Sequence, residues 1–284
     1  MTSTFQFIET KEYHKFVEFC DSCAKYKYIG VCHGLPGVGK TVAAKNYSKW
    51  EIISPTVTKA RSLNQRKNDK IPIEIAHATT IFTTAPPVKS ANLYNELKNL
   101  AINLRYSKES LGIQENKIPE EEAQKMTKHL LYAEDNEPYK SVELVIIDEV
   151  DRLKLQTLEI LRDIYDQNNI GMVLIGMNGL EKKLSRYPQL YSRIGFSHEF
   201  KKIAKTELQH ILEYKWQEVG LALSYEDFED YEAINSILKL SNGNLRLLQR
   251  LFTQIDRVME INNLQKITTE VIEVARKLLI IGTV

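Results

Sequence analysis

The sequence has few cysteines and no long apolar segment, and both absences restrict the kind of protein it encodes. Three cysteines in 284 residues are too few for a disulfide framework. Cys20 and Cys23 form a C-x-x-C pair, but no second pair follows at a suitable spacing, and zinc needs about four ligands. We therefore interpret them as free thiols on a helix. No apolar run approaches the roughly 20 residues that span a bilayer, and the N-terminus lacks the apolar core of a signal peptide, so we expect a cytoplasmic protein.

The chain also lacks a strong net charge, which limits how it can contact nucleic acid. Lysine and arginine total 38 and aspartate and glutamate total 37, giving a formal net charge of +1. A chain with this balance has no overall basic field, so any nucleic-acid surface must be local. The hydrophobic share of 43% is ordinary for a globular protein, and 284 residues can bury one sizeable core with a small satellite domain.

Short apolar segments alternate with amphipathic ones over the first 200 residues. The apolar segments, several of them rich in β-branched residues, lie at residues 28–32, 71–84, 142–147 and 172–175. Residues 92–105 and 155–168 show helical periodicity. Strands that alternate with helices indicate a parallel α/β sheet. Only helical patterns follow residue 200, so we predict an α/β base over residues 1–200 and a small helical lid over residues 201–284.

The loop after the first predicted strand matches the Walker A pattern, G-x-x-x-x-G-K-T, and a helix is predicted to follow it from Lys40 through Trp50. Glycines allow the backbone to approach a phosphate closely, and the N–H groups of the loop and the helix N-terminus then hold the phosphate oxygens. We expect Lys40 to bind the β- and γ-phosphates of ATP and Thr41 to bind Mg²⁺. The predicted nucleotide-binding residues are Gly34, Pro36, Gly37, Val38, Gly39, Lys40, Thr41 and Val42.

Two carboxylates follow the apolar strand predicted at residues 142–147. Asp148 lies at the carboxyl end of that strand, where it can hold Mg²⁺ through the water shell of the ion. Glu149 is placed to orient and deprotonate an attacking water. Together with the upstream phosphate loop, the intact pair indicates nucleotide hydrolysis rather than phosphoryl transfer to a small molecule.

Asn178 follows the strand predicted at residues 172–175 and has two open interpretations. In ATPases that carry both Walker elements, such an amide contacts the γ-phosphate or the attacking water. Asn178 can instead cap the helix that begins near Leu180.

Three arginines are candidates for neutralising phosphate charge. Arg193, in the segment YSRI, is placed to enter the nucleotide site of a neighbouring subunit, and Arg186 is a competitor for that role. Either one can also be a surface ion-pair partner. Arg246, in the segment GNLR at the start of a predicted helix, is placed to reach the phosphates of its own subunit.

Taken in this order, the five segments resemble the motifs of AAA+ ATPases: GLPGVGKT, LVIIDE, VLIGMN, YSRI and GNLR. Within that superfamily, the phrases around the second to fourth motifs are most similar to the DNA-transposition regulators TnsC, TniB and MuB. The resemblance implies an AAA+ P-loop NTPase fold, ATP and Mg²⁺ as cofactors, and self-association into rings or helical filaments on duplex DNA. It further implies target selection and recruitment or activation of a transposase, with hydrolysis driving disassembly.

A local basic cluster is a candidate DNA-binding surface. It lies in a predicted loop and comprises Lys59, Arg61, Arg66 and Lys67, and Lys89 is a further candidate. Contacts from these residues to phosphates predict salt-sensitive, sequence-independent binding, although a solvated loop explains the same charges. Two other functions stay open: a helicase- or clamp-loader-type remodeller, and an anti-phage nucleotide switch that acts on a protein partner.

Overall fold

The computed structural model describes residues 7–59, 70–86, 93–116, 137–214 and 231–279. These residues fall into two compact units. The unit that we call the sheet unit consists of the described parts of Phe16–Gly34 and Thr41–Glu199. The unit that we call the helical unit consists of the described parts of Met1–Lys15, Leu35–Lys40 and Phe200–Val284. The functional division into a base and a lid stays a prediction.

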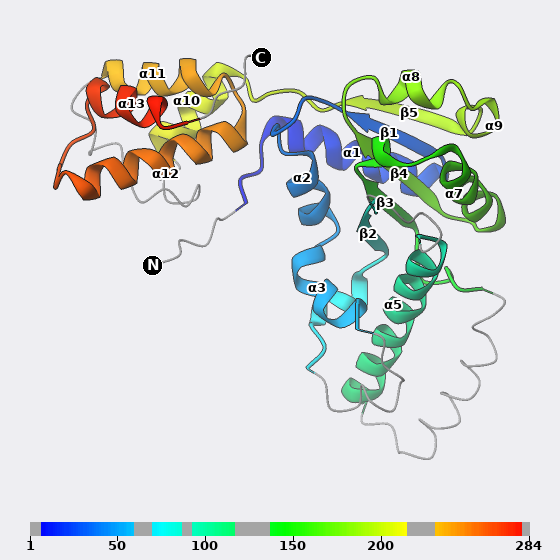
Figure 1. The fold of residues 1–284 in the computed structure, drawn as a ribbon. Helices are drawn as coiled ribbons and strands as arrows, with labels where there is room; N and C mark the ends of the chain where they lie inside the picture. Colours follow the sequence, from blue (N-terminus) through cyan, green and yellow to red (C-terminus); the bar gives the residue numbers. More distant parts are fainter. Residues whose placement is uncertain (1–6, 60–69, 87–92, 117–136, 215–230, 280–284) are drawn as a thin grey trace. The chain divides into compact units, whose positions relative to one another are not determined.

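The sheet unit is built on a five-stranded sheet in the order β2-β3-β4-β1-β5 (Figure 1). All neighbouring strands are parallel. The strands are β1 (Ile29–His33), β2 (Thr80–Thr84), β3 (Leu144–Asp148), β4 (Gly171–Gly176) and β5 (Ile194–Glu199). Every residue of β3 and β4 is buried, as expected for central strands of a parallel sheet covered on both faces. The predicted α/β class is confirmed.

The helices of this unit connect and cover the strands. They are α2 (Lys40–Tyr47), α3 (Trp50–Val57), α5 (Leu93–Asn116), η3 (Val150–Arg152), α7 (Leu155–Gln167), α8 (Leu180–Leu184) and α9 (Pro188–Tyr191). Helix α1 (Lys11–Tyr26) packs against β1 and β4 so closely that a Cβ at Gly171 would lie 2.3 Å from the carbonyl oxygen of Cys23. Both closely packed positions, Gly30 and Gly171, are therefore restricted to glycine.

Two local predictions differ from the structure. Residues 71–84 do not form one strand region, because a 3-10 helix, η1 (Ile73–His77), precedes β2 and buries Ile75. The helix that begins at Lys40 does not continue to Trp50. Lys49 adopts a left-handed backbone conformation with φ of 49°, which ends one helix and turns the chain into α3.

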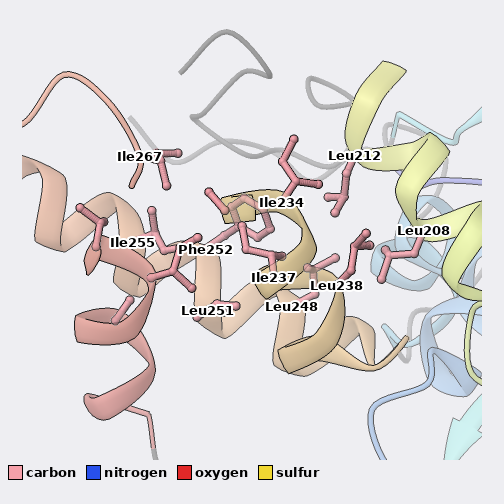
Figure 2. Packing of buried hydrophobic residues seen from close by; sticks show 14 of the residues in the cluster. Leu208, Leu212, Ile234, Ile237, Leu238, Leu248, Leu251, Phe252, Ile255 and Ile267 are labelled. Carbon is pink, nitrogen blue, oxygen red and sulfur yellow. The ribbon is translucent and has the colours of Figure 1, made fainter. Parts of the chain in front are cut away.

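The helical unit has its own apolar core (Figure 2). Its helices are α10 (Lys205–Tyr214), α11 (Tyr231–Ser241), α12 (Leu245–Ile261) and α13 (Thr269–Lys277). Leucine and isoleucine side chains from α10, α11 and α12 meet in this core, and Phe252 is 2% exposed. Asn244 and Thr268 cap α12 and α13 through side-chain oxygens that accept hydrogen bonds from backbone N–H groups. Within the described residues, no helix combines the length and the apolar character needed to cross a membrane.

Candidate active site

The phosphate-loop sequence has the backbone conformation that its glycines predict. Gly37 and Gly39 have φ values of 79° and 112°, in a region that residues with a side chain rarely adopt. The Lys40 side chain is 8% exposed, and its Nζ donates a hydrogen bond of 2.9 Å to the carbonyl oxygen of Leu35, inside its own loop. Val38 anchors the loop with a side chain that is 1% exposed. The two glycines thus set the backbone path of the loop, and the Val38 side chain packs into the interior.

The segment GNLR contacts the same loop within the helical unit. The Asn244 side chain accepts a hydrogen bond from Leu247 N and donates one to the carbonyl oxygen of Pro36, each 3.0 Å long. The backbone N–H of Arg246 donates to the carbonyl oxygen of Gly37 at 3.2 Å. A Cβ at Gly37 would lie 2.5 Å from Asn244 Oδ1, so glycine is required there for this contact as well. The N-terminus of α12 is therefore joined to the phosphate loop, with the Arg246 side chain exposed.

Thr41 and Asp148 meet in the sheet unit. The Thr41 hydroxyl donates a hydrogen bond of 2.5 Å to Asp148 Oδ2, and Asp148 is 3% exposed. The other carboxylate oxygen accepts a hydrogen bond of 2.8 Å from the backbone N–H of Glu149. Asp148 ends β3, whose register pairs it with Thr84 of β2. Two hard oxygen ligands therefore converge at the carboxyl edge of the sheet.

Glu149 stands beside this pair in a constrained backbone conformation. Its φ of 57° is left-handed, which is uncommon for a residue with a side chain, at the point where the chain passes from β3 to η3. The carboxylate forms an ion pair with Arg152, one turn along η3. The side chain remains 40% exposed and is accessible to solvent.

Asn178 lies just beyond the end of β4, which separates β1 from β3 in the sheet. Its Oδ1 lies 3.5 Å from Nδ1 of His33, the last residue of β1. His33 Nε2 is also 3.8 Å from a carboxylate oxygen of Glu181. The N-cap position of α8 is occupied by Gly179. This observation disfavours the helix-cap interpretation of Asn178.

The two candidate trans-acting arginines differ in their surroundings. Arg193 donates two hydrogen bonds to the carboxylate of Asp166, from Nε at 2.5 Å and from Nη2 at 2.7 Å. The hydrogen bonds to Asp166 also raise the pKa of the Arg193 guanidinium. Arg193 further donates to the carbonyl oxygen of Gln189. Arg186 is exposed, and within the described part of the chain its side chain has no ion-pair partner.

The structure describes little of the basic cluster. Lys59 follows α3 and is exposed. Arg61, Arg66, Lys67 and Lys89 lie outside the described residues. The remaining predicted nucleotide contacts are Gly34, which is buried, Pro36, which is exposed, and Val42, which is 56% exposed.

These residues fit ATP and Mg²⁺. A Cβ at Gly37 or Gly39 would introduce a side chain into a loop with positive φ, whereas glycine leaves backbone N–H groups accessible to phosphate oxygens. Thr41 and Asp148 present oxygen ligands of the kind that Mg²⁺ prefers. The Mg²⁺ ion, when bound, neutralises charge that develops on the phosphate oxygens.

Three residues that contact the predicted site residues were not identified from the sequence. These are Asn244, Arg152 and Asp166, which contact the phosphate loop, Glu149 and Arg193 respectively. Asn244 had a readable signal, because asparagine before a helical segment favours an N-cap. No sequence signal pairs Asp166 with Arg193, since the two residues lie on different elements.

Comparison with known proteins decides the family. The model of the AAA domain family matches residues 23–184, which is more than half of the chain. The chain belongs to the AAA domain family. A Staphylococcus aureus protein described as a potential ATP-binding protein is 49% identical over 284 residues, covering 99% of each chain. A Haemophilus influenzae protein, the Mu-like prophage FluMu DNA transposition protein B, is 25% identical over 87% of this chain and 71% of its own length.

Solved structures share the fold of this AAA-domain chain. The Thermotoga maritima RuvB Holliday junction branch migration motor has a TM-score of 0.54 and 17% identity, covering 96% of this chain and 70% of its own. The Aeropyrum pernix ORC2 protein, in ADPNP–ADP complexes, has a TM-score of 0.60 and 16% identity, covering 100% of this chain and 72% of its own. At these identities the likeness establishes the fold alone.

Proposed function

We propose that the chain is an ATP-hydrolysing AAA+ regulator of transposition that self-associates into a ring or helical filament on duplex DNA. The observation that carries the DNA part is the 25% identity, over 87% of the chain, to the Mu-like prophage transposition protein B. By this proposal the protein binds DNA independently of sequence, selects the target and recruits or activates a transposase. ATP hydrolysis then drives disassembly.

The residues described above have distinct roles in the proposed hydrolysis. The loop N–H groups and Lys40 hold the phosphates, and Thr41 and Asp148 hold Mg²⁺. Glu149 orients the attacking water and accepts its proton, which requires its carboxylate to release Arg152 or to share it. Asn178 contacts the γ-phosphate or the water, and Arg246 contacts the phosphates from α12.

Two arginines are candidates for the trans-acting role, and they differ in the contacts that each must break to reach a neighbouring subunit. Arg193 has to exchange the carboxylate of Asp166 for a phosphate of the neighbouring subunit. Arg186 has no such partner to give up within the described residues. Measuring ATP hydrolysis by assembled Arg186→Ala and Arg193→Ala variants separates them, since removal of a trans-acting arginine lowers kcat by about 10³-fold or more. The other variant should retain most of its activity.

Nucleotide-dependent assembly on DNA tests the proposal. The protein is mixed with ATP or a slowly hydrolysed analogue, with and without duplex DNA, and imaged by negative-stain electron microscopy. We expect rings or filaments that need both nucleotide and DNA. Assembly that is indifferent to DNA would instead support a remodeller or switch that acts on a protein partner.

The variant Glu149→Gln sharpens this test, because the amide cannot accept the proton but leaves the Walker A residues intact. We expect it to remain assembled on DNA after ATP addition, whereas the parent protein disassembles. A variant that assembles less than the parent contradicts the role assigned to Glu149.

A further inference from the structure

A cavity of about 760 Å³ lies within the sheet unit, at the β2 edge of the sheet. Helices α3 and α5 lie side by side there (Figure 1). Its described lining consists of Lys45, Trp50, Thr58, Phe82, Thr83, Thr84, Asn95, Glu96, Asn99, Leu100 and Asn103. The volume is in the range of sites that bind ligands, and none of the nucleotide-site residues lines it.

One wall of the cavity is a row of asparagines on α5. Asn95, Asn99 and Asn103 are four residues apart and line the same cavity. Asn95 and Asn99 are exposed, and their carboxamides have no partner among the described residues. Each carboxamide offers both a donor and an acceptor. The wall therefore presents two accessible pairs of hydrogen-bonding groups, on Asn95 and Asn99, about one helical turn apart.

The spacing of this row matches an extended peptide. Residues four apart on a helix are separated by about 6 Å along its axis, and an extended chain repeats its outward N–H and C=O groups about every 6.6 Å. A peptide backbone laid along α5 can thus exchange hydrogen bonds with successive carboxamides.

The floor of the cavity suits an apolar side chain of such a peptide. The rings of Trp50 and Phe82 meet there with centroids 6.0 Å apart, and the largely buried Leu100 lies beside them. Alternate side chains of an extended chain point to opposite sides, so one of them would face this floor while the backbone follows the asparagines.

The charges of the lining disfavour nucleic acid at this place. Lys45 is the one basic residue among the described lining residues, and its Nζ is held 2.7 Å from Glu51 Oε1. The Glu96 carboxylate, which accepts a hydrogen bond from the Thr83 hydroxyl, adds a negative charge to the wall. A phosphodiester backbone needs unpaired lysines or arginines, which the described residues of the lining do not offer.

We propose that this cavity binds an extended peptide segment, uncharged or basic, through the backbone of the peptide. The Asn95 and Asn99 carboxamides hydrogen-bond to its N–H and C=O groups, and the floor of Trp50, Phe82 and Leu100 accepts one apolar side chain. Thr84, which lines the cavity, is the register partner of Asp148, so the bound peptide lies one strand away from the Mg²⁺ ligands.

Tryptophan fluorescence of the full chain tests this site. The substitution Trp216→Phe removes the second tryptophan of the chain, so that the signal comes from Trp50 alone. An array of capped hexapeptides, with and without a lysine, supplies the probes, and the tightest binder is then resynthesised with N-methylated peptide bonds. We expect Trp50 emission to saturate with the parent peptide and the N-methylated peptide to bind at least tenfold more weakly.

Substitutions in the row of asparagines provide a second test of peptide binding. Asn95→Ala and Asn99→Ala should each weaken the peptide about five- to tenfold, since each removes one or two hydrogen bonds. Both replace exposed helical residues with a better helix former, so the fold should be retained, as circular dichroism and ATP binding will show. Gln156→Ala, which truncates an exposed carboxamide on α7, is the matched control and should bind like the parent.

Several outcomes overturn the proposal. These are no hexapeptide that changes Trp50 emission, equal affinity of the N-methylated peptide, or unchanged affinity in both asparagine variants. An eight-residue oligothymidylate that displaces the peptide, or changes Trp50 emission by itself, assigns the cavity to single-stranded nucleic acid instead.

Discussion

The sheet unit and the helical unit place their candidate functional groups by different means. In the sheet unit, side chains from the end of a strand and the start of a helix meet, as Asp148 of β3 and Thr41 of α2 do at 2.5 Å. In the helical unit, the contacts are made to backbone carbonyl oxygens of the phosphate loop, by Arg246 N and by the Asn244 side chain. Substitutions in the sheet unit should therefore change chemistry, and those at the start of α12 should change the conformation of the loop.

The largest expected effect is on catalysis in the sheet unit. Glu149→Gln should lower kcat for ATP hydrolysis by about 10²- to 10⁴-fold, because the amide cannot take up the proton of the attacking water. The dissociation constant for ATP should change little. Phosphate release and equilibrium binding of a fluorescent ATP analogue measure the two quantities. Glu143→Gln, at the residue just before β3 begins, is the control and should hydrolyse ATP at the parental rate.

The next effect compares two glycines with positive φ, one in each unit. Gly243 has φ of 72°, and a Cβ there would lie 2.3 Å from the carbonyl oxygen of Ile203. Gly179 has φ of 93°, with open space around the same position. Gly243→Ala should lower the free energy of unfolding by about 3 kcal/mol, from strain and overlap together. Gly179→Ala should cost about 1 kcal/mol, from strain alone.

Urea denaturation followed by circular dichroism measures both glycine variants. Equal losses for Gly243→Ala and Gly179→Ala would show that the contact with Ile203 relaxes freely. The start of α12 would then be far less constrained than its hydrogen bonds indicate.

The sequence predicted the features that are encoded by residues close to one another in the chain. The Walker segments and the alternation of strands with helices are periodic or contiguous signals, and the α/β class followed from them. The ion pair of Arg193 with Asp166 had no such signal, because it joins the end of α7 to the turn before β5. The helix break at Lys49 was missed because neither glycine nor proline marks it, and a lysine rarely adopts the left-handed conformation that it has here.

The cavity lined by α3 and α5 also could not be predicted, because its lining residues are far apart in the sequence. The asparagine repeat at positions 95, 99 and 103 is visible in the sequence, but its meaning depends on what faces it. Trp50 and Phe82 come from different elements, and only the folded sheet unit places them opposite α5. A regular polar pattern on a helix otherwise indicates a solvated face.

A smaller effect separates the two bonds of Asn244. Asn244→Asp keeps the oxygen that caps α12 but loses the N–H donor to Pro36, whereas Asn244→Ala loses both. The alanine variant should lower the free energy of unfolding by about 1 kcal/mol. The aspartate variant should unfold like the parent yet bind ATP several-fold more weakly. Denaturation and nucleotide titration check this, and equal ATP affinity in all three proteins would contradict a role for Asn244 in shaping the loop.

The smallest effect uses the cysteines, all three of which lie in the sheet unit. Burial raises the pKa of the Cys23 thiol to about 12 and also raises that of Cys20, and neither side chain is exposed. An unfolded thiol titrates near 8.5. The unfolded state therefore loses protons first as pH rises, and the free energy of unfolding falls between about pH 9 and pH 12. At pH 8 the loss is only a few tenths of a kcal/mol.

The rate of thiol labelling measures how often the sheet unit opens, because its cysteines are buried. At pH 8 the native thiols should react with a disulfide reagent only through opening of the sheet unit, since the buried protonated form is unreactive. Gly30→Ala should accelerate labelling, because a Cβ there would lie 2.4 Å from Cys23 Sγ. Gly243→Ala should leave the labelling rate unchanged if the helical unit opens by itself. An equal acceleration by both variants would mean that the two units open together, and the contrast between them would then hold for chemistry but not for stability.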